Sequence, residues 1–203
     1  MTSNAILRQN ARSQLGENIF GNTWVILGVV SFLYSAAIGA LGSTFIGVIL
    51  LGGPLTYGLY RVLVNVVNYK KVDVNDVVSG FTEAFGNSLV LYFLQTLFTA
   101  LWSLLFVIPG IVKSYSYAMA MYIQQDYPEK EGKDCIDQSR LMMDGHKWQL
   151  FCLDCSFIGW YLLGALCLGV GIFFVLPYHQ LARTNFYLAL KAEKENDYQV
   201  ITD

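Results

Sequence analysis

Six long apolar segments, separated by short polar or glycine-rich stretches, constrain this chain more than any other feature. They form three pairs, which are 23–40 with 44–68, 88–107 with 111–123, and 148–166 with 172–190. About 20 apolar residues in a helix span the ~30 Å hydrocarbon core of a bilayer, so each pair is predicted to form a transmembrane hairpin. The 203 residues are 55% hydrophobic and 14% charged, whereas soluble domains carry about 25% charged residues. We therefore expect an all-α, polytopic membrane protein with six transmembrane helices.

A more polar segment precedes each hairpin. Apolar residues recur at helical spacing in about 4–16, 73–85 and 133–144, which is typical of amphipathic helices that lie in the plane of the membrane. Ser3 and Asp73 are suitable N-caps for the first two of them. The expected organisation is one membrane domain, 1–203, with hairpins at about 22–68, 87–124 and 147–191.

The distribution of Lys and Arg predicts the orientation. The turns at 40–43, 108–110 and 167–171 contain neither residue type. The other side of the predicted bundle collects the basic residues Arg8, Arg12, Lys70, Lys71, Lys130, Lys133, Arg140, Lys147, Lys191 and Lys194. Because basic loops stay in the cytoplasm, both termini are predicted to be cytoplasmic.

Asp154 and Arg183 lie at matching distances from the third turn, one on each arm of that hairpin. The helical rise puts both about 20 Å from the turn, inside the hydrocarbon core. An unpaired charge there costs about 2.5 to 3.5 kcal/mol, so the two side chains are predicted to pair. The pair either marks a functional site or only locks the hairpin, and the sequence leaves both readings open.

Four further residues are candidates for the same site. Arg61 lies at a depth close to that of the pair, while Lys113 lies nearer the outer side. Gln95 and His179 could add hydrogen bonds, and His179 could instead bond a carbonyl freed by Pro177 or relay a proton. Three bases against one acid would attract an anion, unless Arg61 and Lys113 extend to opposite interfaces.

The three hairpins resemble one another loosely. They open with Gly21-Asn22-Thr23-Trp24, Gly86-Asn87-Ser88-Leu89 and Gly145-His146-Lys147-Trp148. The second arm of each contains a proline followed by a base, in the pairs Pro54 and Arg61, Pro109 and Lys113, and Pro177 and Arg183. An internal threefold repeat would fit transporter folds, although chance similarity is the alternative.

Several classes of function are disfavoured. The net charge of −2 and the absence of nucleic-acid modules argue against a nucleic-acid partner. The sequence has no phosphate-cradling glycine loop, nucleophile elbow or HExxH zinc signature. We therefore expect no enzyme activity, no cofactor and no metal site.

Several motifs between about Leu51 and Tyr187 carry a resemblance to a known family. They are Gly52-Gly53-Pro54-Leu55, Trp102-Ser103-Leu104-Leu105, the run from Ile108 to Ala120, Ser139-Arg140-Leu141-Met142-Met143, Gly145-His146-Lys147-Trp148 and the run from Leu153 to Trp160. In these motifs the second half of the chain resembles an uncharacterised family of six-span bacterial membrane proteins, which is distantly similar to the membrane domain fused to some glycerophosphodiester phosphodiesterases. The resemblance implies a six-span, multi-pass protein of the bacterial plasma membrane and hints at lipid or phosphodiester handling, without the catalytic domain of those proteins.

The expected function is non-enzymatic binding or movement of an anionic ligand, such as a lipid headgroup, in a basic intramembrane cavity. Membrane lipids are the expected partners, and a homo-oligomer is possible. The alternative is an accessory or scaffold subunit that docks a protein partner through its cytoplasmic segment, with Ile136 and Met143 as contacts. A third and least favoured hypothesis is an intramembrane hydrolase that uses Asp154 and His179, which helical rise would separate by about 6 Å in depth.

Overall fold

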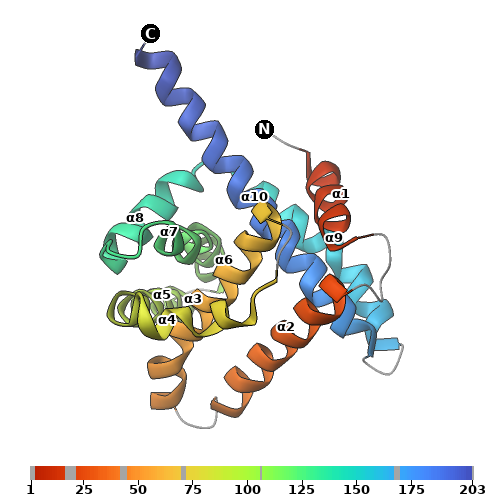
Figure 1. The fold of residues 1–203 in the computed structure, drawn as a ribbon. Coiled ribbons are helices and arrows are strands. Elements are labelled where there is room, and N and C mark those ends of the chain that lie inside the picture. Colours follow the sequence, from red (N-terminus) through yellow and green to blue (C-terminus); the bar gives the residue numbers. More distant parts are fainter. Residues whose placement is uncertain are drawn as a thin grey trace. The chain divides into compact units, whose positions relative to one another are not determined.

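The computed structural model describes residues 3–16, 22–41, 45–69, 72–105, 107–166 and 170–202, and all regular secondary structure in these ranges is helical (Figure 1). The helices are α1 (Asn4–Leu15), α2 (Asn22–Leu41), α3 (Phe45–Tyr69), the 3-10 helix η1 (Val74–Val78), α4 (Ser79–Thr82), α5 (Phe85–Leu105), α6 (Val107–Tyr117), α7 (Ala120–Asp126), α8 (Gly132–Met142), α9 (Lys147–Leu166) and α10 (Val170–Thr202). The chain forms two compact units. The first comprises Met1–Val29, Leu63–Val72 and Trp148–Asp203, and the second comprises Val30–Val62 and Asp73–Lys147.

In the first unit, α1 packs along α10. Ser3 caps α1 as predicted, because its hydroxyl accepts the Ala5 amide N–H at 3.3 Å. The predicted apolar face of α1 consists largely of buried residues, with only Ile6 exposed. The side-chain amides of Gln14 and Asn185 exchange hydrogen bonds of 3.0 and 2.8 Å. This face of α1 therefore covers protein, whereas the sequence analysis expected it to enter the membrane interface.

The third hairpin also belongs to the first unit. Its arms approach at the backbone, because a Cβ atom on Gly171 would lie 2.5 Å from Gly164 Cα. The turn at 167–169 lies outside the described residues. Helix α10 keeps Pro177 inside it, as predicted, but continues to Thr202, well beyond the expected end of the hairpin near residue 191.

In the second unit, the backbones of two other helices contact α3 at two of its glycines. A Cβ atom on Gly53 would lie 2.5 Å from the Ser88 carbonyl oxygen, and one on Gly58 would lie 1.9 Å from the Val77 carbonyl oxygen. Only glycine lets α5 and η1 approach α3 this closely. Asp73 caps η1 as predicted, but η1 and the four-residue α4 replace the continuous amphipathic helix expected at 73–85.

The second arm of the middle hairpin is broken. The sequence analysis expected one helix over 111–123, whereas α6 ends at Tyr117 and α7 begins at Ala120. Pro109, expected in the turn, lies in the first turn of α6, where its missing N–H costs no helical hydrogen bond.

Side chains from two other helices satisfy the backbone at this break. The buried Ser139 hydroxyl, on α8, donates to the Ser116 carbonyl at 2.8 Å and accepts the Met119 amide N–H at 3.2 Å. Gln95 Nε2, on α5, donates to the Tyr117 carbonyl at 3.3 Å. A helix can be interrupted at membrane depth only when freed backbone groups find such partners.

Four helices are long and apolar enough to cross a membrane, at Asn22–Ala40, Leu50–Tyr69, Phe85–Leu104 and Lys147–Leu166, which is compatible with a membrane protein. The other two predicted spans do not meet both criteria within the described residues. Helix α6 has only 11 residues, and α10 carries the polar residues His179, Gln180, Arg183, Thr184 and Asn185. The six-span layout, its hairpins and the orientation of its termini stay predictions.

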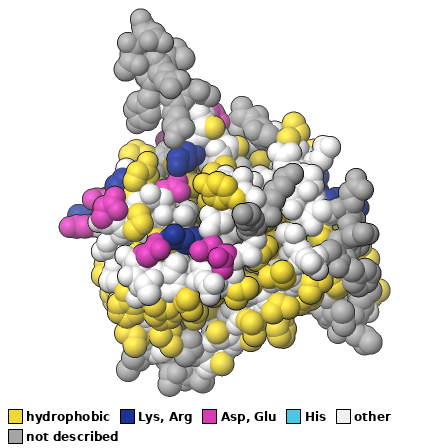
Figure 2. Space-filling model, viewed as in Figure 1, with side chains coloured by type: hydrophobic (Ala, Val, Ile, Leu, Met, Phe, Trp, Pro, Cys, Tyr) yellow, Lys and Arg dark blue, Asp and Glu magenta, His cyan; other side chains and the backbone are white. Residues whose placement is uncertain are grey.

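Large apolar side chains remain exposed on α2 and α5. Among them are Val25, Val29, Phe32 and Leu33 on α2, and Val90, Phe93, Leu97, Leu101 and Leu104 on α5. On the face drawn in Figure 2, hydrophobic side chains cover much of the surface, and the acidic and basic side chains lie in a few small clusters. Exposed apolar surface on this scale is unusual for a soluble monomer and suits contact with lipid.

Helix α8 corresponds to the amphipathic segment predicted at 133–144. Ile136, which is 2% exposed, and Met143, which follows the helix and is fully buried, face the protein, whereas Leu141 is 73% exposed. Ile136 and Met143 were predicted to contact a docked partner, and that assignment is wrong because neither reaches the surface. Whether the protein docks a partner by another surface stays a prediction.

Candidate functional site

Asp154, His179 and Arg183 form a cluster between α9 and α10. Asp154 Oδ1 lies 2.8 Å from His179 Nε2 and 3.6 Å from Arg183 Nε. His179 and Arg183 are four residues apart on α10, so both point to the same side of that helix. The predicted ion pair is confirmed, and His179 joins it in direct contact with Asp154.

Two residues that the sequence analysis missed extend this cluster. The Tyr161 hydroxyl lies 3.0 Å from His179 Nδ1, and the Phe157 ring packs on the imidazole with 4.6 Å between ring centroids. Both follow Asp154 on α9 at helical spacing, by three and seven residues, and this periodicity could have identified them.

The cluster has a defined hydrogen-bond order. A carboxylate only accepts, so the His179 Nε2 proton is donated to Asp154. A neutral imidazole then accepts the Tyr161 hydroxyl proton at Nδ1. Both described hydrogen-bonding partners of the imidazole belong to the cluster, which fits a structural lock.

Arg61 lies in the second unit, on α3, among acidic residues. Its guanidinium forms an ion pair with Glu83 and lies 3.7 Å (Nε to Oδ1) from Asp76 on η1. The sequence analysis expected three bases against one acid, but Arg61 has two acids of its own. Asp154 and Arg183 belong to the first unit, so the single cavity that was to combine them with Arg61 stays a prediction.

Lys113 lines a cavity of about 470 Å³ between α6 and α8. The other lining residues are Ser116, Asp137, Arg140, Leu141, Asp144 and Lys147. Arg140 Nη1 pairs with Asp137 Oδ1 at 3.0 Å, which leaves Lys113 and Lys147 facing one further acid, Asp144, in this lining. The Lys113 ammonium also lies 4.8 Å from the ring centroid of Trp102. With three basic and two acidic side chains, the described lining has a net charge of +1.

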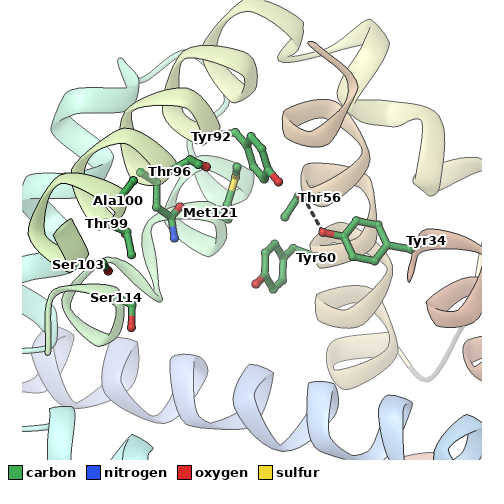
Figure 3. Close-up of a pocket in the computed structure, with 11 residues that line it drawn as sticks. Tyr34, Thr56, Tyr60, Tyr92, Thr96, Thr99, Ala100, Ser103, Ser114 and Met121 are labelled. Carbon is green, nitrogen blue, oxygen red and sulfur yellow. Dashed lines mark hydrogen bonds between the residues drawn. The ribbon is translucent and has the colours of Figure 1, made fainter. Parts of the chain in front are cut away.

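Gln95 lines a second, larger cavity, which has about 530 Å³ and is shown in Figure 3. The full lining is Tyr34, Thr56, Tyr60, Tyr92, Gln95, Thr96, Thr99, Ala100, Ser103, Ser114 and Met121. Among these described residues none is charged, so an anion has no counter-charge there. Gln95 therefore serves the broken helix and this uncharged cavity, whereas the sequence analysis assigned it to a basic one.

Within the first unit, Asp154, His179 and Arg183 are in contact. Within the second unit, Arg61, Gln95 and Lys113 each have their own described surroundings. Within the described ranges, no three His, Cys, Asp or Glu side chains gather into a metal site.

The comparisons with known proteins identify a family. The family described as "Protein of unknown function (DUF975)" matches residues 1–121 and 104–194. No curated protein and no solved structure matches the chain. Since the two family matches extend over nearly the whole sequence, the chain belongs to the DUF975 family.

Proposed function

We propose that this protein is a non-enzymatic, multi-pass protein of the bacterial plasma membrane that binds an anionic ligand in the cavity between α6 and α8. In this proposal α6 with α7, and the first half of α10, add two spans to the four apolar helices. Both termini then lie in the cytoplasm, and the ligand is a phosphate-bearing lipid headgroup, which the protein holds or moves.

The basic lining of this cavity carries the proposal. Lys113 on α6 and Lys147 at the start of α9 are ammonium groups that can each contact a phosphate oxygen. The Ser116 hydroxyl donates to the Val112 carbonyl at 3.0 Å, so the two ammonium groups are the donors that the proposal relies on. Basic pockets between transmembrane helices are typical sites for anionic headgroups.

Lipid retention in native mass spectrometry tests the proposal. The full chain is purified from nanodiscs that contain phosphatidylglycerol and phosphatidylcholine in equal amounts. We expect preferential retention of phosphatidylglycerol. The double variant Lys113→Gln with Lys147→Gln should weaken it roughly thirtyfold, because each basic group near a membrane surface contributes about 1 kcal/mol.

Lys130→Gln is the matched control. Lys130 also lies over an aromatic ring, with its ammonium 4.6 Å from the ring centroid of Tyr127, but it does not line the cavity. This variant should keep the preference for phosphatidylglycerol. Equal retention of the two lipids by the unmodified chain, or equal losses in the double variant and the control, would contradict the proposal.

A further inference from the structure

We infer that the uncharged cavity in Figure 3 is a second binding site, for a neutral polyhydroxylated group such as a sugar. The inference is independent of the anion site. It rests on the hydrogen-bonding state of the lining hydroxyls, on the tyrosine rings and on the absence of charge among the described lining residues.

The hydroxyl protons of Thr56, Tyr34 and Ser114 are already donated. Thr56 Oγ1 donates to the Gly52 carbonyl at 2.6 Å, so the Tyr34 hydroxyl, 2.9 Å away, must donate to Thr56. Ser114 likewise donates to the Ile111 carbonyl at 2.7 Å. These hydroxyl oxygens therefore present lone pairs to a ligand, and they favour one that is rich in hydrogen-bond donors.

The amide of Gln95 can both accept and donate. Its NH₂ group uses one hydrogen for the Tyr117 carbonyl at the broken helix, which leaves the second N–H and the carbonyl oxygen for a ligand. Thr96, Thr99 and Ser103 follow one another along the α5 wall, where each hydroxyl can both donate and accept. A ligand with several hydroxyl groups can donate to the hydroxyls that only accept and can also bond to the hydroxyls of α5. A purely apolar ligand can form neither kind of hydrogen bond.

Aromatic rings supply the apolar part of the site. Tyr34, Tyr60 and Tyr92 point toward the space between them in Figure 3, from three different helices. Tyr92 is positioned against the backbone of α3, because a Cβ atom on Gly52 would lie 2.7 Å from its ring. Tyrosine combines a flat apolar face with a polar edge, which matches the C–H face and hydroxyl rim of a sugar.

Size and charge narrow the ligand class further. A cavity of about 530 Å³ is within the range of sites that hold small molecules. An anion would lack a basic partner in the described lining, and an organic cation would lack a carboxylate. A neutral sugar, either free or carried as a glycolipid headgroup, has the chemistry that this lining recognises.

The test uses the full chain in nanodiscs of phosphatidylethanolamine and phosphatidylglycerol. One arm titrates free sucrose and follows binding by calorimetry, and the other arm adds monoglucosyl diacylglycerol and measures its retention by native mass spectrometry. Binding in either arm is expected, and the arm that responds identifies the source of the sugar. Thr96→Val with Thr99→Val should weaken binding about two- to tenfold for each hydroxyl removed.

Two further variants make the result decisive. Ala100→Phe fills the cavity and should abolish binding in the responding arm. Thr184→Val is the matched control, since Thr184 is a buried threonine on α10 outside the cavity lining, and it should bind normally. The inference is overturned by an absence of binding in both arms, by full binding in Ala100→Phe, or by binding of tetramethylammonium in place of the sugar.

Discussion

Ser139 offers the sharpest test of how the broken helix is stabilised. Its hydroxyl serves two backbone groups, the Ser116 carbonyl and the Met119 amide N–H, and Ser139, Ser116 and Met119 are at most 2% exposed. Ser139→Ala leaves both groups buried without this partner. Each such group costs about 1 to 3 kcal/mol, so the free energy of unfolding should fall by about 2 to 6 kcal/mol.

The measurement is reversible unfolding of the full chain in mixed micelles, with the fraction of sodium dodecyl sulfate increased stepwise and helix content followed by circular dichroism. Ser88→Ala is the matched control. Ser88 is also fully buried, but its hydroxyl donates only to the Phe85 carbonyl in the adjoining turn of α5, at 3.1 Å. Its loss should cost about 1 kcal/mol or less. Equal destabilisation by the two substitutions would refute the assigned role of Ser139.

Three other outcomes are expected. Gly58→Ala should lower the free energy of unfolding by about 1 to 3 kcal/mol in the same assay, because its Cβ would lie 1.9 Å from the Val77 carbonyl oxygen, and a normal stability would contradict that contact. A double-mutant cycle of Arg61→Gln and Glu83→Gln should give a coupling energy of about 0.5 to 1 kcal/mol for this partly exposed ion pair. A coupling energy of zero would show that the ion pair does not stabilise the protein. Burial raises the pKa of Cys135 from 9.0 to about 11, so its thiolate is about a hundredfold rarer below pH 9. With the other cysteines replaced by serine, Cys135 should resist a polar maleimide at pH 8 until the protein is unfolded, and rapid labelling of the folded chain would contradict its burial.

Much of the helix layout could be predicted from apolar periodicity and capping residues. The Ser3 and Asp73 caps depend only on neighbouring backbone, so local sequence was sufficient to identify them. The ion pair of Asp154 and Arg183 followed from the cost of burying either charge alone. The contact of His179 with Asp154 was not predicted, because counting residues gives depth along a helix and not the reach of a side chain.

The errors came from contacts between segments distant in the sequence. The break after Tyr117 is not marked by glycine or proline, and it depends on Ser139 and Gln95 from two other helices. The partners of Arg61 follow the span in which it lies, so a count of charges within spans could not include Asp76 and Glu83. Periodicity also identifies an apolar face without showing what covers it, as the buried face of α1 illustrates.

The hydroxyl of Ser139 makes hydration of the middle hairpin depend on helix α8. If α8 lifts away, the carbonyl of Ser116 and the N–H of Met119 lose their partner, and hydrocarbon chains can provide no substitute. Water is the replacement that can hydrogen-bond to both groups. Displacement of α8 and entry of water at the break between α6 and α7 are therefore coupled. In this way α8, which is too polar to span a bilayer, controls whether water reaches the backbone of the neighbouring hairpin.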